Sequence, residues 1–137
     1  MPAAAIDIAP KGRRVLLVED DGLVRLVASE LLALAGFSVM EAADAEAAMV
    51  YLGRGNVPDV LVTDIQMPGP FDGLALADMV AARWPHVGIL VCSSHARPSA
   101  DELPRGARFL AKPHAPGALV RQVTDLAPRP EPALASE

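Results

Sequence analysis

Four short apolar segments of this 137-residue chain are each followed directly by side chains that could carry chemistry. Apolar runs of this length are typical of buried parallel strands, and the functional crevice of an open α/β sheet lies at the carboxyl ends of its strands. We therefore expect carboxylates, a hydroxyl and an ammonium to meet at one edge of one sheet. The segments and the residues after them are 15–18 with Glu19, Asp20 and Asp21, 60–63 with Asp64, 89–92 with Ser93 and Ser94, and 109–111 with Lys112.

This combination of side chains suits a divalent cation and a phosphoryl group. Mg²⁺ prefers oxygen ligands, which Glu19, Asp20 and Asp64 would supply together with the backbone carbonyl of Gln66. With the metal bound, Asp64 stays ionised and can act as a nucleophile toward phosphorus. The metal and the Lys112 ammonium would neutralise charge on the phosphoryl oxygens, so the expected product is an aspartyl phosphate.

The pattern of apolar residues predicts strands that alternate with helices. Between the last two strands, the segment 96–105 contains Pro98 and Pro104 and has room for only about one helical turn. The alternation predicts a doubly wound, flavodoxin-like sheet of five parallel strands in the order 2-1-3-4-5, with a shortened or missing fourth helix. The expected strands are 14–19, 37–40, 59–63, 87–92 and 107–111, and the expected helices are 21–35, 44–52, 72–83 and 116–126.

Composition narrows the class of protein. The net charge of -5 argues against nonspecific nucleic-acid binding, which needs a basic face. No stretch of roughly 18 uncharged apolar residues is present, so no membrane span is expected. The lone Cys92 lies in an apolar run and fits a reducing compartment, which indicates a cytoplasmic protein. We expect a flexible N-terminal arm over residues 1–12, one domain over 13–127 and a disordered tail over 128–137.

Taken together, these features resemble the receiver domain of bacterial two-component response regulators over about residues 13–127. Each motif is weak by itself, but all occur in the family's order and at compatible spacings. The motifs are the acidic run Glu19-Asp20-Asp21, Asp64, Met67-Pro68 with Asp72-Gly73, Ser93, and Lys112-Pro113.

The resemblance implies a role for each of these positions. Asp64 would be the phosphoacceptor, which receives the phosphoryl group from the phosphohistidine of a sensor kinase or phosphotransfer protein. The acidic pair before it would bind the metal, with Asp20 the more direct ligand. Phosphate contacts would then favour one of two loop arrangements. The remaining roles are Ser93 and Lys112 as ligands of the phosphoryl group and Phe109 as the aromatic switch residue.

The chain also departs from the family pattern. The span from Ser93 to Lys112 is shorter than usual, and the helix it would normally contain is the family's usual output surface. His114 stands where a Phe often follows Lys-Pro, and His95 occupies a position that tunes dephosphorylation in the family. This proline-rich replacement resembles some stand-alone receivers that are paired with alphaproteobacterial kinases.

The helix predicted over 21–35 carries a candidate docking surface. At 100° per residue, Val24, Ala28 and Leu31 share one face, while Leu26 points nearly opposite and Leu23 lies on the flank. An exposed apolar patch beside the acidic site indicates a surface for a helical partner, and the resemblance suggests that this partner is the kinase.

We therefore interpret the chain as a stand-alone phosphoacceptor response regulator that signals through protein contacts with an unknown downstream protein and does not turn over an external substrate. A phosphate sink and a degenerate scaffold receiver remain alternatives. An aspartate-nucleophile phosphatase would need a second Asp as general acid at the position of Gln66. A flavodoxin-like electron carrier would need a phosphate-binding loop where Glu19 and Asp20 stand.

Overall fold

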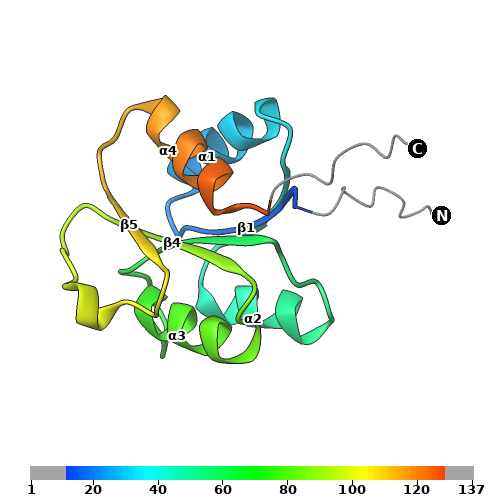
Figure 1. Cartoon of the computed structure of the whole chain (residues 1–137). Helices are drawn as coiled ribbons and strands as arrows, with labels where there is room; N and C mark the ends of the chain where they lie inside the picture. The colour runs from blue at the N-terminus through cyan, green and yellow to red at the C-terminus, as the bar shows by residue number, and fades with distance from the viewer. Residues whose placement is uncertain (1–11, 129–137) are drawn as a thin grey trace.

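A parallel sheet lies between two pairs of helices in the computed structural model, which describes residues 12–128 (Figure 1). Its strand order is β2-β1-β3-β4-β5, which confirms the predicted flavodoxin-like fold. Except for Gly12 and Pro128, the expected arm and tail lie outside the described residues. The strands are β1 (Arg14–Val18), β2 (Ser38–Ala42), β3 (Val60–Asp64), β4 (Gly88–Ser93) and β5 (Arg108–Ala111).

The helices begin where the sequence offers capping side chains. Asp21, Asp44 and Asp72 each stand before a helix, and each side chain accepts hydrogen bonds from backbone N–H groups of the first turn. Pro116 opens the last helix, where its missing N–H costs nothing. The helices are α1 (Gly22–Leu34), α2 (Ala45–Gly53), α3 (Gly73–Arg83) and α4 (Pro116–Leu126).

The helices cover the two faces of the sheet in pairs. α1 and α4 lie on the upper side of the sheet in Figure 1, and α2 and α3 lie below it. Each face has its own hydrophobic cluster, one around Leu32 and Val123 and the other around Leu52 and Val80. β1, β3 and β4 are almost wholly buried between these clusters, as continuous apolar runs require. None of the helices among residues 12–128 has both the length and the apolarity to cross a membrane.

The connection between β4 and β5 contains only the 3-10 turn η1 (Ala100–Glu102). Pro98 and Pro104 bracket this turn, and neither has a backbone N–H to continue a helix. The N–H of Ser99 donates to the Glu102 carboxylate at 2.8 Å, which closes the turn. The shortened fourth helix predicted from the sequence is confirmed.

One element differs from its predicted extent. β2 begins at Ser38 and reaches Ala42, whereas the expected strand covered only 37–40. Glu41 and Ala42 are held in the strand because they pair with Leu17 and Val18 of β1. Cross-strand pairing therefore overrides the weak strand preference of Glu and Ala.

Candidate functional site

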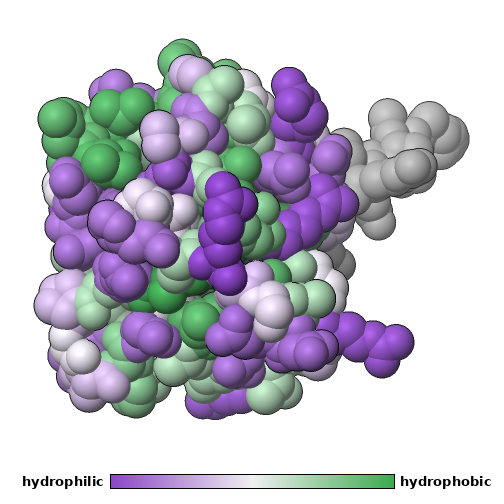
Figure 2. All heavy atoms as spheres, turned by 90° about the vertical axis from the view of Figure 1, so that its left-hand side faces the viewer, coloured by the Kyte–Doolittle hydropathy of each residue, from purple (hydrophilic) through white to green (hydrophobic). Residues whose placement is uncertain are grey.

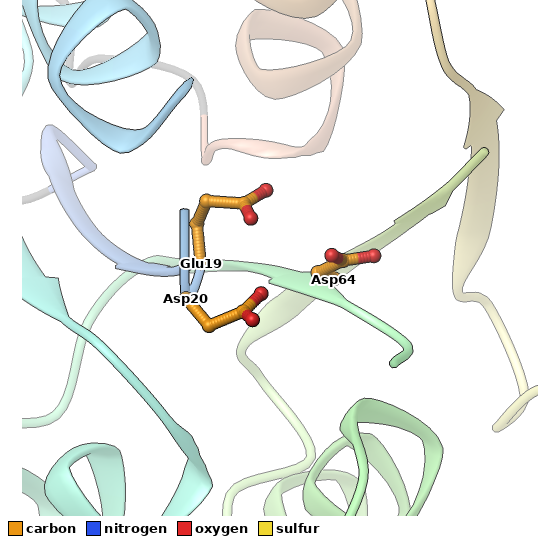
Figure 3. A group of neighbouring side chains, drawn as sticks. All are labelled: Glu19, Asp20 and Asp64. Carbon is orange, nitrogen blue, oxygen red and sulfur yellow. The ribbon is translucent and has the colours of Figure 1, made fainter. Parts of the chain in front are cut away.

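Three carboxylates meet at the carboxyl edge of the sheet. Glu19 and Asp20 directly follow β1, and Asp64 ends the neighbouring strand β3. One oxygen atom from each residue lies within 4.8 Å of the oxygens of the other two. Figure 3 shows Glu19 and Asp20 reaching from the end of β1 toward the side of Asp64. The structure thus brings together the carboxylates that the sequence places at strand ends.

The cluster fits a hard divalent cation. Around an octahedral Mg²⁺, ligand oxygens about 2.1 Å from the ion lie roughly 3 to 4.2 Å from one another, close to the spacing found here. Glu19 is buried, Asp64 is half-buried and Asp20 is exposed, so the cluster opens to solvent on one side. These carboxylates therefore have the donor chemistry and the access that a hydrated cation needs.

Lys112, directly after β5, supplies the positive charge of the site. Its ammonium donates a hydrogen bond to Glu19 and lies 3.5 Å from Oδ2 of Asp64. Burial alone would lower the pKa of Lys112, but the hydrogen bond to Glu19 and the charges of Asp64 and Glu19 outweigh it and raise that pKa. The ammonium is therefore charged throughout the physiological pH range.

The backbone around Asp64 is fixed by a close approach of α3. Oδ1 of Asp64 accepts a hydrogen bond from the N–H of Ile65 at 2.8 Å, and the N–H of Gly73 donates to the Ile65 carbonyl at 2.7 Å. A Cβ atom on Gly73 would lie 1.7 Å from the carbonyl oxygen of Asp64. Only glycine fits at this position. The sequence showed Gly73 as part of a motif, but it gave no sign of this contact.

Ser93, the last residue of β4, is buried and holds the loop that follows it. Its Oγ accepts hydrogen bonds from the N–H groups of His95 at 3.1 Å and Ala96 at 3.0 Å. The neighbouring Ser94, the alternative hydroxyl donor, is exposed. Phe109 of β5 is half-buried and packs against the hydrophobic cluster on the α2–α3 face. The switch roles of Ser93 and Phe109 stay predictions, as does the ligand role of the Gln66 carbonyl.

An apolar groove of about 320 Å³ runs between α1 and α4 and ends at Glu19, Asp64 and Lys112. Its lining includes buried residues of three strands, among them Cys92. Burial, with the charges of Asp64 and Glu19 and against the charge of Lys112, raises the pKa of the Cys92 thiol from 9.0 to about 12. The thiol is therefore uncharged and behaves as a small hydrophobic group.

The first half of α1 is more exposed than its pattern suggested. Leu23 and Leu26 are exposed, 71% and 50%, as the helical periodicity implies. Val24, assigned to the inner face with Ala28, is nevertheless 41% exposed and lines the groove. The physical reason lies in α4, which begins with Pro116 and the small residues 117–118 and so leaves the first turns of α1 uncovered.

Hydrophobic side chains gather on the same part of the surface in the space-filling view. Figure 2 looks at the side of the molecule that is on the left of Figure 1, and the hydrophobic residues gather at its upper left, on the side of the sheet that α1 and α4 cover. Five of the seven large exposed apolar residues that the described part of the chain contains belong to α1. The patch, here called the α1 patch, consists of Leu23, Val24, Leu26, Val27 and Leu34.

Comparisons with known proteins agree with the fold and the site. The family model of the response regulator receiver domain matches residues 15–124. A protein-glutamate methylesterase/protein-glutamine glutaminase from Anaeromyxobacter dehalogenans is 41% identical over 88 residues, which cover 64% of this chain and 24% of that protein. The response regulator FleR from Pseudomonas aeruginosa is 33% identical over 110 residues, which cover 78% of this chain and 23% of FleR.

Solved structures give the same answer. The crystal structure of a response regulator receiver protein from Sinorhizobium medicae superposes with a TM-score of 0.79 at 29% identity, covering 83% of this chain and 93% of that one. The chain belongs to the response regulator receiver domain family, and it is thereby assigned to two-component signalling. It spans about a quarter of the length of the two curated relatives.

Proposed function

We propose that this chain accepts a phosphoryl group on Asp64 from the phosphohistidine of a sensor histidine kinase or a phosphotransfer protein, and that it does so with Mg²⁺. The observation that carries the proposal is the meeting of Glu19, Asp20 and Asp64 within 4.8 Å, with the Lys112 ammonium 3.5 Å from Asp64. A nucleophile, a cation site and a phosphate-binding cation thus lie together at one end of a groove that opens to solvent.

Each side chain has a part in this transfer. The N–H of Ile65 engages Oδ1 of Asp64, so Oδ2, on the side of Lys112, is the oxygen that attacks phosphorus. The phosphorus–nitrogen bond of the donor breaks as the bond to Oδ2 forms, and the electron pair leaves with the histidine nitrogen. Mg²⁺, held by the acidic cluster and the Gln66 carbonyl, would neutralise the charge on the phosphoryl oxygens. Lys112 pairs with a phosphoryl oxygen on the opposite side.

The response to phosphorylation involves Ser93 and Phe109. The hydroxyl oxygen of Ser93 accepts two backbone N–H groups, but its proton is still available to a phosphoryl oxygen. A turn of this hydroxyl toward the phosphate changes its bonds to the loop after β4, and Phe109 on the adjacent strand repacks with that loop. The phosphate therefore shifts the population between two loop arrangements.

The phosphoryl donor docks on α1. A donor that reaches Asp64 must cover the end of the groove, and the α1 patch, with Leu23 and Leu26, continues from there along the helix. Within residues 22–34, Arg25 and Glu30 are the charged side chains, so the face suits an apolar surface of a helical partner. We propose this face as the kinase-docking surface.

The output is a protein contact, and the chain does not turn over an external substrate. Gln66, at the position where a phosphatase of this chemistry has its general acid, cannot protonate a leaving group. A phosphate sink is the second candidate, because only the three-residue turn η1 replaces the helix that serves as the usual output surface.

Phosphorylation tests the proposal directly. The full chain is incubated with Mg²⁺ and acetyl phosphate, or with a phosphorylated kinase, and the mass of the intact protein is measured. We expect labelling of the wild type and of Asp78→Asn, an exposed control on α3, but not of Asp64→Asn. Beryllofluoride with Mg²⁺ should shift amide resonances around Ser93 and Phe109 in the wild type only. Equal labelling of Asp64→Asn would contradict the assignment.

Docking has its own matched pair of variants. Leu26 of α1 and Val50 of α2 are equally exposed, 50% and 51%, but only Leu26 belongs to the α1 patch. Leu26→Asp should slow phosphotransfer from the cognate kinase at least tenfold and leave labelling by acetyl phosphate unchanged. Val50→Asp should change neither rate. Equal kinase-dependent rates in the two variants would rule out docking at this face.

A further inference from the structure

Arg25, in the second turn of α1, reaches back to the acidic turn that precedes the helix. Its Nη1 donates a hydrogen bond to the backbone carbonyl of Glu19 at 2.7 Å. Its Nε donates to the carboxylate of Glu41 on β2 at 3.2 Å. The side chain is 23% exposed and is therefore held at one end by the metal-site turn and at the other by the sheet.

The bonded carbonyl belongs to the peptide that joins the two acidic residues. A rotation of this peptide changes the direction in which both the Glu19 and the Asp20 side chains leave the backbone. On either side of it, the N–H of Glu19 donates to the Ala42 carbonyl at 3.0 Å and the N–H of Asp21 donates to Oε2 of Glu19 at 3.1 Å. Arg25 completes this set of contacts by fixing the peptide oxygen itself.

We propose that Arg25 is a positioning residue for divalent-cation binding. It orients the Glu19–Asp20 peptide so that both carboxylates face Asp64, and Glu41 keeps the guanidinium in place. A planar guanidinium suits this task because it donates in two fixed directions, which an ammonium cannot do. The inference rests on the proposed function for the presence of a cation site, and it adds the residue that sets the affinity of that site.

Positioning and simple electrostatics predict opposite effects on the affinity. A guanidinium near the cluster repels a divalent cation, so its removal should strengthen cation binding if charge were its only contribution. If Arg25 orients the ligands, its removal should weaken binding instead. Arg25→Lys keeps the charge but loses the fork, so electrostatics predicts no change for it and positioning predicts weaker binding.

The experiment is a Mg²⁺ titration of the full-length chain followed by amide NMR, for wild type, Arg25→Gln and Arg25→Lys. Arg108→Gln is the matched control, because Arg108 pairs with Asp125 at 3.4 Å on a surface outside the acidic cluster. We expect the dissociation constant to rise about tenfold for Arg25→Gln and about threefold for Arg25→Lys, and to stay within about twofold for the control.

Two further measurements separate the possible failures. Urea unfolding shows whether each variant is folded, and Arg25→Lys carries the test if Arg25→Gln is not. Unchanged or tighter Mg²⁺ binding by the folded variants would overturn the role of Arg25 and leave the proposed function intact. A wild type that neither binds Mg²⁺ nor becomes phosphorylated would overturn the proposed function, and the positioning role with it.

Discussion

Lys112, which follows β5, donates a hydrogen bond to Glu19, which follows β1, although β3 and β4 lie between these two strands in the sheet. The contact passes over the end of β3 and brings the ammonium to 3.5 Å from Asp64. Glu19 is only 5% exposed, so its charge depends on this partner. The site therefore contains its own counter-charge before any metal or phosphate arrives.

Removal of Lys112 should expose that dependence. Lys112→Met leaves the buried Glu19 carboxylate without its cation, and we expect the free energy of unfolding to fall by about 2 to 3 kcal/mol. Mg²⁺ can replace the lost charge, so it should stabilise Lys112→Met more than it stabilises the wild type. Urea unfolding with and without Mg²⁺ measures both effects. Arg121→Met, an exposed change on α4, is the control, and an equal Mg²⁺ response in all three proteins would contradict the expectation.

Gly73 should be intolerant of any side chain. A Cβ atom there would overlap the Asp64 carbonyl, so Gly73→Ala must displace the phosphoacceptor strand end or the start of α3. We expect a loss of stability of about 3 kcal/mol and a strong loss of labelling by acetyl phosphate. Gly53, in the last turn of α2, has nothing within 4 Å of the corresponding position, and Gly53→Ala should keep both properties. Similar behaviour of the two variants would show that the close approach is unimportant.

The chemistry-bearing residues of the site were predictable because they stand directly after apolar runs. Strands with alternating helices pack in parallel, and parallel strands bring their carboxyl ends to one edge. Asp64 and Lys112 are 48 positions apart, but this rule alone places them together (112 − 64 = 48). The proline pair 98 and 104 likewise predicted the reduced helix between β4 and β5.

Residues that act through tertiary contacts were not predictable in the same way. Arg25 looks like a solvated helix residue in the sequence, since its two acceptors come from different elements. The exposure of Val24 depends on how α4 begins, and no periodicity within α1 contains that information. The sequence therefore indicates which groups reach the site and not which groups hold them in place.

Ser93 should control the loop after β4 even without phosphate. Ser93→Ala removes the acceptor of two backbone N–H groups, and we expect a loss of about 1 to 2 kcal/mol together with faster amide exchange at His95 and Ala96. Hydrogen exchange by NMR measures this effect residue by residue. Ser94→Ala, one position further and exposed, should leave the exchange rates unchanged. Equal protection of these amides in Ser93→Ala would show that the loop is held by other contacts.

Cys92 should make the fold sensitive to alkaline pH. Its pKa is about 12 in the folded chain and near 9.0 when unfolded, so the folded state retains a proton that the unfolded state loses as pH rises above 9. Stability is thus unaffected by this group below pH 9 and falls between pH 9 and 12. By pH 10.5 the loss from this thiol should reach about 2 kcal/mol.

The comparison that isolates the thiol uses differences between two pH values. Cys92→Ala is less stable than the wild type at pH 8 because it leaves a small cavity, but it should lose less stability between pH 8 and 10.5. Val91→Ala, a buried change on the same strand that keeps the thiol, should retain the full alkaline loss. Urea unfolding at both pH values measures it. Lys112 is present in all three proteins, so its own titration affects each alike, and an identical alkaline loss in Cys92→Ala would assign the effect to Lys112 instead.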